Sequence, residues 1–273
     1  MKLDLHTHTK NSDGEKTVLG NVERAIELGL DGVAICDHDS IESWKEIDNI
    51  NKPIKIIKGV ELSTFYENDS VHVLGYYLNK GTHQELETFL TTQKKLRMER
   101  VYKIINLLKE HFNIELTYEE IAKYADGVIG RPHIAKAIIA KYPEKNYTIQ
   151  DIFDLFLGND SPAYVKSSNL QTKDAIDILH RNNCIAVMAH PLLIKKHNYQ
   201  DVLSLDFDGI EVFYAYEDPK CNYQEVLENV KDKDLLLTGG SDYHGPNVYD
   251  SMGKAYLEDE YAIEFLKRIN KLD

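Results

Sequence analysis

Nine side chains that can bind metal ions are spread along this chain, and they come where its strands are expected to end. Six are histidines and three are carboxylates: His6, His8, His38, His72, His190, His244, Asp13, Glu61 and Asp242. Neutral imidazole and carboxylate oxygen are the ligands that hold catalytic Zn, Mn or Fe. Nine such groups are more than one ion can use. The sequence therefore predicts a site with several metal ions and, with it, hydrolysis.

These ligands lie in short motifs. The chain opens with His6-Thr7-His8, and Asn11-Ser12-Asp13-Gly14, Asp37-His38-Asp39, Gly59-Val60-Glu61, Val71-His72-Val73, Ala189-His190-Pro191 and Gly240-Ser241-Asp242-Tyr243-His244 follow. Asp37 and Asp39 are left out of the ligand set, because they are expected to support the ligands and to cap a helix. Asp39, followed three residues later by Glu42, has the capping-box spacing that would start a helix near residue 41.

Short apolar runs alternate with amphipathic helical stretches, which is typical of β/α units and a parallel sheet. Strands are expected at 2–5, 32–36, 54–62, 70–77, 185–189, 209–213 and 235–238, and helices at 18–28, 41–47, 173–181, 224–229 and 260–270. This order predicts an α/β protein, an irregular (β/α)₇ barrel. In such barrels the site forms at the C-terminal rim, where the nine candidate ligands fall, although His72 lies inside a strand pattern.

The stretch between the fourth and fifth predicted strands has a helical pattern without strands. A long helix is predicted after residue 82, with Leu86, Leu90, Val101 and Leu108 among the apolar residues at helical spacing, and Thr117 with Glu120 would cap another helix. We expect residues 1–80 and 162–273 to form the barrel and residues 81–161 to form a helical insertion, or cap, on the same rim as the histidines.

Composition limits the function classes. The 273 residues carry a formal charge of -13, which argues against binding of duplex DNA or other duplex nucleic acid. Three divalent ions with three carboxylates would nevertheless give the site a charge of about +3, enough to attract phosphate. No apolar run is long enough for a membrane helix and no signal peptide is recognisable. With three unclustered cysteines, the chain is expected to be cytoplasmic.

With these motifs in this order from His6 to His244, the chain resembles the PHP family, the polymerase and histidinol phosphatase metal-dependent phosphoesterases. The resemblance implies three divalent ions, with Mn²⁺ favoured and Fe²⁺ or Zn²⁺ also compatible. His6, His8, Glu61 and Asp242 would bind the first ion. Asp13, His38 and His244 would bind the second, and His72 and His190 the third, with Glu61 bridging to the first.

Within the family, the chain resembles the branch that removes the 3′-phosphate from nucleoside 3′,5′-bisphosphates and can trim short RNA from the 5′ end. The resemblance rests on the Asn-Ser-Asp-Gly spacing, the insertion after His72, and Gly130-Arg131-Pro132-His133-Ile134-Ala135 inside it. It implies hydrolysis by a metal-bridging hydroxide, with a small nucleotide or a short RNA end as substrate. Asp13, Glu61, Asp242 and His244 are the predicted catalytic residues.

Arg131 and His133 are the predicted substrate contacts. A guanidinium can form a bidentate pair with a second phosphate, and the imidazole can add one hydrogen bond. Both residues could instead serve a helix N-terminus. Lys166 and Tyr164 could touch phosphate, but an ordinary strand edge explains them equally well.

Two alternatives stay open from the sequence. One is an enzyme of the same chemistry with another substrate, such as a histidinol-phosphate or cyclic-phosphate phosphoesterase. The other is a non-catalytic metal-binding accessory module. Phosphate release by the Mn-loaded protein from a panel of esters separates these possibilities.

Overall fold

The computed structural model describes residues 1–125, 129–166, 170–216, 222–248 and 250–269. Eight strands form one sheet in the order β7-β6-β5-β4-β3-β2-β1-β8. They are β1 (Lys2–Thr7), β2 (Gly32–Ile35), β3 (Lys55–Tyr66), β4 (Asp69–Tyr77), β5 (Cys184–Met188), β6 (Gly209–Tyr214), β7 (Leu236–Gly240) and β8 (Leu257–Glu258). All seven strands expected from the sequence are present, so the predicted fold class is confirmed.

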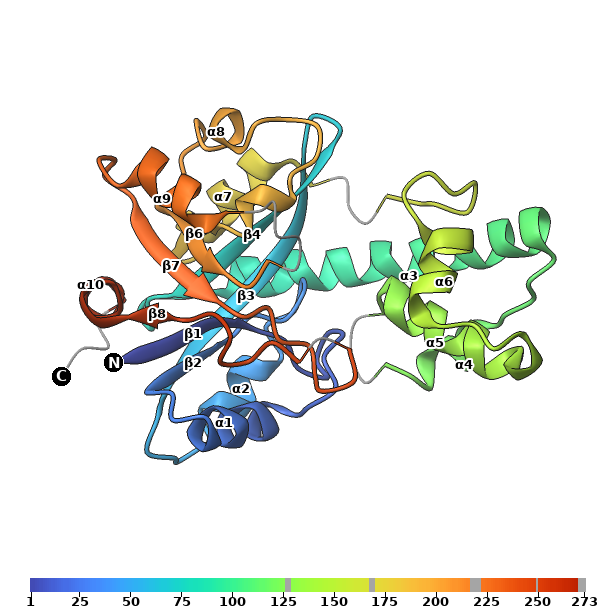
Figure 1. Cartoon of the computed structure of the whole chain (residues 1–273), viewed down its shortest axis with the longest axis horizontal. Helices are drawn as coiled ribbons and strands as arrows, with labels where there is room; N and C mark the ends of the chain where they lie inside the picture. Colours follow the sequence, from blue (N-terminus) through green and yellow to red (C-terminus); the bar gives the residue numbers. More distant parts are fainter. Residues whose placement is uncertain (126–128, 167–169, 217–221, 249, 270–273) are drawn as a thin grey trace.

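The sheet curls into a nearly closed barrel whose seam lies between β1 and β7 (Figure 1). Few hydrogen bonds between described residues cross the seam. The His8 amide donates to the Tyr243 carbonyl at 2.8 Å, the Tyr243 amide donates to the His6 carbonyl at 3.4 Å, and the Ser241 amide donates to the Asp4 carboxylate at 2.9 Å. Gly240 allows this close approach, because a Cβ there would lie 2.4 Å from the Cβ of His6.

Two features of the sheet differ from the expectation of parallel β/α units. Strand β4 is antiparallel to both β3 and β5, and the short β8 pairs antiparallel with β1. Only two residues separate β3 from β4, whereas a parallel connection needs about a dozen or more. The parallel arrangement holds for β1-β2-β3 and for β5-β6-β7.

The helices expected around the barrel lie on its outside (Figure 1): α1 (Val18–Glu27), α2 (Ser43–Ile47), α7 (Thr172–Arg181), α9 (Tyr223–Val230) and α10 (Asp259–Arg268), joined by the short α8 (Tyr199–Val202). Helix α1 illustrates why these helices form and pack against the sheet. Its residues Val18, Val22 and Ala25 face the core, and Thr17 caps its first turn. The capping box predicted at Asp39 and Glu42 is wrong. Glu42 itself precedes α2, and the Asp39 side chain is bonded elsewhere.

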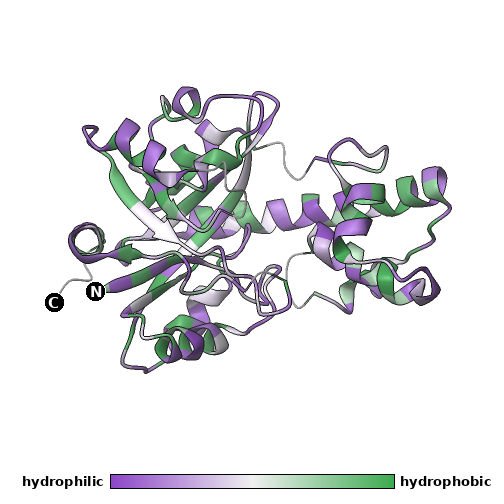
Figure 2. Cartoon of the chain, in the orientation of Figure 1, coloured by the Kyte–Doolittle hydropathy of each residue, from purple (hydrophilic) through white to green (hydrophobic). Residues whose placement is uncertain are grey.

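The cap consists of α3 (Gln84–Phe112), α4 (Tyr118–Ala122), α5 (Arg131–Lys141) and α6 (Ile149–Ile152). Helix α3 runs from the barrel into the cap, and its middle stretch is hydrophilic (Figures 1 and 2). Leu86 and Leu90 pack in the barrel core, while Val101, Ile104 and Leu108 pack in a separate cluster drawn from residues 101–165. The capping box at Thr117 and Glu120 is present as predicted. The exact division at residues 81 and 161 stays a proposal.

No helix in the described part of the chain is long and apolar enough to cross a membrane. Cys36 and Cys184 are buried free thiols, and Cys221 lies outside the described residues.

Candidate metal centre

All nine candidate ligands meet at one rim of the barrel. His6 lies on β1, Glu61 on β3 and His72 on β4, while the others follow strands: His8 after β1, His38 after β2, His190 after β5, and Asp242 and His244 after β7. Asp13 lies on the loop after His8. His72 reaches this rim although it lies inside a strand, because β4 is antiparallel to β3 and β5 and begins where those two strands end.

Glu61 is at the centre of the cluster and faces five imidazoles. Its Oε1 lies 2.8 Å from His72 Nδ1 and 3.1 Å from His190 Nε2. Its Oε2 lies 3.0 Å from His38 Nδ1 and 3.3 Å from the Nε2 atoms of both His6 and His8. The side chain is 1% exposed, so solvent does not screen this charge. One carboxylate can therefore bridge neighbouring cations.

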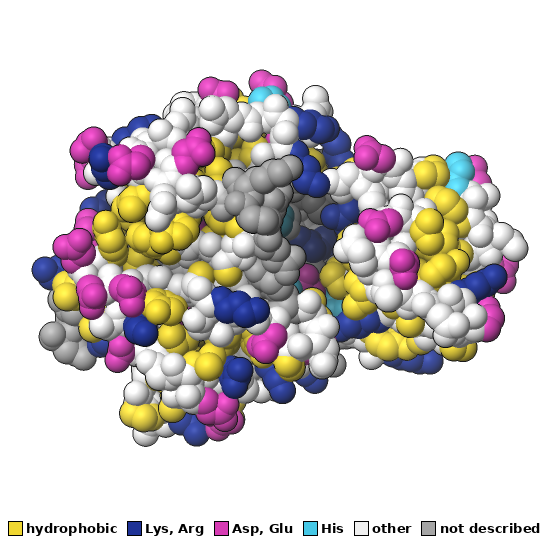
Figure 3. All heavy atoms as spheres, in the orientation of Figure 1, with side chains coloured by type: hydrophobic (Ala, Val, Ile, Leu, Met, Phe, Trp, Pro, Cys, Tyr) yellow, Lys and Arg dark blue, Asp and Glu magenta, His cyan; other side chains and the backbone are white. Residues whose placement is uncertain are grey.

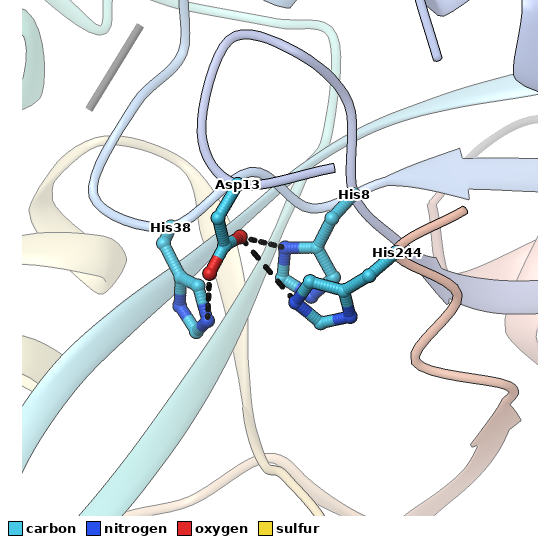
Figure 4. A group of neighbouring side chains, drawn as sticks. All are labelled: His8, Asp13, His38 and His244. Atoms are coloured by element: carbon cyan, nitrogen blue, oxygen red, sulfur yellow. Dashed lines mark ion pairs between the residues drawn. The ribbon is translucent and has the colours of Figure 1, made fainter. Parts of the chain in front are cut away.

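Three groups of side chains have the spacing to hold an ion. They are His6, His8, Glu61 and Asp242; His8, Asp13, His38 and His244; and His38, Glu61 and His72, with ligand atoms within 4.8 Å of one another in each. Figure 4 shows the second group, in which the Asp13 carboxylate faces the three imidazoles. Asp13 Oδ1 lies 3.3 Å from His244 Nε2. His190 does not belong to any of the three groups, but it contacts Glu61.

The chemistry of these atoms fits bound cations. The buried polar atoms without a hydrogen bond include His6 Nε2, both His8 ring nitrogens, Asp13 Oδ1, His38 Nδ1, Glu61 Oε2 and Asp242 Oδ1. Leaving such atoms buried without a partner is costly, and the donor types suit Mn, Fe and Zn. Two residues, His190 with φ 27° and Asp242 with φ 53°, also have left-handed backbone conformations, which are strained in non-glycine residues.

Several carboxylates and imidazoles of the cluster shift one another's pKa values. Burial by itself lowers the pKa of His8, but its close contacts with the Asp242 and Glu61 carboxylates outweigh burial and raise that pKa to about 10. Burial raises the pKa of Glu61, but the charges of His38, His72 and His6 outweigh it and hold that pKa well below its usual value. Burial dominates at His38 and lowers its pKa to about 4. Ions that need neutral imidazole would displace the His8 proton.

Residues behind the ligands hold them in place, and sequence reasoning missed several. Glu211 on β6 faces His6 Nδ1 at 3.1 Å and accepts a bond from the His190 amide at 2.9 Å. Tyr214 donates its hydroxyl to Asp242 Oδ2 at 2.9 Å. Asp4 is buried and accepts bonds from the Ser241 and His6 amides. Glu211 and Asp4 could have been noticed as single acidic residues in apolar strands, but that pattern alone does not reveal which residue each of them contacts.

The two predicted substrate contacts lie at the start of α5, beside the cluster. A Cβ on Gly130 would lie 3.6 Å from Asp13 Oδ2, so this helix begins next to the ligands. Arg131 is half-buried, and its Nη1 donates to the Leu157 carbonyl and to Asn159 Oδ1. His133 is buried and its Nδ1 accepts a bond from the Gly130 amide, which leaves the proton on Nε2.

Comparison with known proteins agrees with this geometry. A model of the PHP domain matches residues 4–160, more than half of the chain. The chain belongs to the PHP domain family. A 5′-3′ exoribonuclease from Haemophilus influenzae is 32% identical over 261 residues, which cover 93% of each protein. A 3′,5′-nucleoside bisphosphate phosphatase from Chromobacterium violaceum is 25% identical over 260 residues, covering 89% of this chain and 87% of that protein.

The fold is shared with a solved PHP relative. The crystal structure of a Bifidobacterium adolescentis protein, classed as a metal-dependent phosphoesterase, superposes with a TM-score of 0.85 at 28% identity and covers 99% of this chain and 96% of that one. The chain is therefore a metal-dependent phosphoesterase of the PHP family, as the motifs predicted.

Proposed function

We propose that this protein removes the 3′-phosphate from nucleoside 3′,5′-bisphosphates and also releases nucleotides from the 5′ end of short RNA. The observation that carries the choice of substrate is Arg131, a half-buried guanidinium beside the ligand cluster with no carboxylate partner among the described residues. The names of the two relatives, an exoribonuclease and a bisphosphate phosphatase, support the same substrate class.

We propose that three divalent ions bind, with Mn²⁺ favoured by the resemblance. His6, His8, Glu61 and Asp242 would hold one, Asp13, His38 and His244 the second, and His72 and His190 the third, with Glu61 shared. When bound, such ions lower the pKa of a coordinated water and withdraw charge from the phosphoryl oxygens. The catalytic residues would be those that hold these ions and act through them: Asp13, Glu61, Asp242 and His244.

The chain's own residues would hold the second phosphate of the substrate. Arg131 uses Nη1 for the Leu157 carbonyl and Asn159, so Nη2 and Nε make no hydrogen bond with the described residues. These two donors can form a bidentate pair with a phosphate. His133 lies on the same helix turn and would add one contact. A substrate held at one phosphate would then be oriented for cleavage at the other.

We also propose that the protein is located in the cytoplasm, because free buried thiols such as Cys36 and Cys184 suit a reducing compartment.

The test is a kinetic comparison of the Mn-loaded protein on adenosine 3′,5′-bisphosphate, 3′-AMP, 5′-AMP and an aryl phosphate. The bisphosphate should give the highest kcat/KM. Arg131→Ala should raise KM for the bisphosphate about tenfold, since a charge-assisted pair is lost, and leave the aryl phosphate nearly unchanged. Arg24→Ala, which removes a partly exposed arginine paired with Glu27, is the matched control. Equal effects of Arg131→Ala on both substrates would remove Arg131 from this role.

A further inference from the structure

A second cavity, outside the metal cluster, lies between the barrel and the cap. Its volume is about 530 Å³. One side is formed by Ser70 at the start of β4 and by Lys195 and Lys196, and the other by Asn159 of the cap and by Tyr164 and Lys166 just after it. Figure 3 shows Lys and Arg side chains around the hollow between the two parts of the molecule.

Three lysines and two carboxylates line this cavity, so it has an excess of one positive charge in a protein whose net charge is -13. Lys166 and Lys195 have no ion-pair partner within the described ranges; the Lys166 ammonium instead lies 5.1 Å from the centre of the Phe65 ring. Among the residues that the structure describes, Lys196 Nζ donates only to the Asn68 carbonyl, at 3.3 Å. Two carboxylates, Asp69 and Asp160, also line the cavity. Asp69 accepts bonds from the Lys196 and His197 amides, so it holds the lysine-bearing segment in place.

Elements that carry the proposed reaction site also line the cavity. Ser70 precedes the ligand His72 by two residues on β4, and Lys195 follows the ligand His190 on the next loop. On the cap side, Asn159 accepts the bond from Arg131, and the Arg131 guanidinium lies 5.6 Å from the centre of the Tyr164 ring.

A buried arginine supports the side of the cavity that Tyr164 and Lys166 form. Arg100 is 6% exposed and donates its Nε to the Val165 carbonyl at 2.8 Å. In the part of the chain that the structure describes, it forms no ion pair, so its charge is not cancelled locally. This charge favours an anion in the space in front of Tyr164 and Lys166.

We propose that this cavity binds the part of a single-stranded RNA that lies 3′ to the cleaved phosphate. Lys166, Lys195 and Lys196 would contact its phosphates, and Tyr164 offers an aromatic surface for a base. The proposal rests on the proposed function and deepens it. In both substrates water adds to phosphorus, the bond to the first nucleoside's 3′-oxygen breaks, and that oxygen leaves with a proton. In RNA the phosphate stays on the 5′-oxygen of the next nucleotide, whereas a bisphosphate has nothing there to fill the cavity.

The experiment compares two substrates and two double variants. Lys195→Ala/Lys196→Ala should lower kcat/KM for a short 5′-phosphorylated oligoribonucleotide roughly tenfold and change that for adenosine 3′,5′-bisphosphate by less than about twofold. The salt dependence of RNA cleavage should also weaken, by about 0.7 in log–log slope for each phosphate that the variant no longer neutralises.

The matched control is Lys52→Ala/Lys231→Ala. These exposed lysines pair with Glu23 and Glu228 and lie just before β3 and β7, at the opposite rim of the barrel, so neither substrate should be affected. An equal loss on both substrates, or no loss on RNA, would overturn the proposal.

A binding measurement tests this proposal independently of the proposed function. Fluorescence anisotropy with chelator-treated protein and the same labelled oligoribonucleotide needs no turnover. The cavity predicts a Kd about tenfold higher for the lysine double variant than for the control. If neither substrate is hydrolysed, the proposed function fails, and the anisotropy result still decides whether the cavity binds RNA.

Discussion

Glu211 is the residue whose side chain fixes the orientation of His6. Both of its oxygens lie within 3.3 Å of His6 Nδ1, so Nδ1 carries the proton and Nε2 faces Glu61 and Asp242. Carboxylates behind ligating histidines commonly raise metal affinity in this way. We expect Glu211→Gln to weaken metal binding about 10- to 100-fold, because the charge is lost while the shape is kept. Titration of activity and of bound Mn²⁺ against total Mn²⁺ measures the effect.

Asp208→Asn provides the control for Glu211. Asp208 also pairs with an imidazole, His180 at 2.8 Å, but it precedes β6 and lies at the other end of that strand from the ligands. This variant should lose some stability and keep its metal affinity. If both variants bind Mn²⁺ like the wild type, the Glu211 carboxylate does not orient His6 for an ion.

At the scale of elements, helix α3 is tied to the metal centre through Arg97. Its guanidinium donates to the Asp39 carboxylate and, at 2.7 Å, to Ser63 Oγ. Asp39 directly follows His38, has φ 47°, and is bonded to both the Glu61 carbonyl and the Ser63 amide. We expect Arg97→Met to cost about 3 kcal/mol of stability, since it leaves a buried carboxylate unpaired, and to weaken metal retention about tenfold.

Lys94→Met separates a general effect on α3 from this specific one. Lys94 lies one turn earlier on the same helix and pairs with Glu42 beside the same loop, but both side chains are about half exposed. Its loss should cost at most about 0.5 kcal/mol and leave metal content unchanged. Metal content measured well below Tm, with partial rescue by Arg97→Lys, distinguishes positioning of His38 from loss of folding. Unchanged metal retention in Arg97→Met would rule out the link.

The strands were predictable because apolar runs such as Gly32–Ile35 and Cys184–Met188 are buried on both faces. Their directions were less so. The orientation of β4 depends on the short turn after Tyr66, and β8 has only two residues, too few to leave a pattern. Asp39 shows a similar limit: its spacing to Glu42 suited a cap, but Arg97, 58 residues away, provides the partner that decides its conformation.

The ligands themselves were easier to predict from the sequence than the residues that hold them in place. Residues that follow parallel strands must meet at one rim, so the positions of His38 and His190 follow from the strand pattern alone. Glu211 and Asp4 are single acidic residues inside apolar strands, and their partners are set by how the sheet curls. No local pattern encodes that contact.

For the whole molecule, the candidate ions would close the barrel. His6 and His8 lie on or after β1, whereas Asp242 and His244 follow β7, on the other side of the seam. His8 Nε2 lies 2.9 Å from Asp242 Oδ1, so one ion held by both would link the two edges. Among the described residues, few hydrogen bonds cross the seam; they include those of the Thr7–Tyr243 bridge and the bond from the Ser241 amide to the Asp4 carboxylate. Ion binding should therefore stabilise the seam more than the rest of the sheet.

Removal of metal tests this link between the site and the fold. A ligand present at about 100 times its Kd adds about 2.7 kcal/mol to stability, so Mn²⁺ added to chelated protein should raise Tm by several degrees. Asp242→Asn should lose most of that rise, because one side of the seam then lacks its charged ligand. Hydrogen exchange followed by mass spectrometry should show that Mn²⁺ protects the amides of β1 and β7 more than those of β5. Equal protection of all strands would mean that the ions stabilise the fold without closing the barrel.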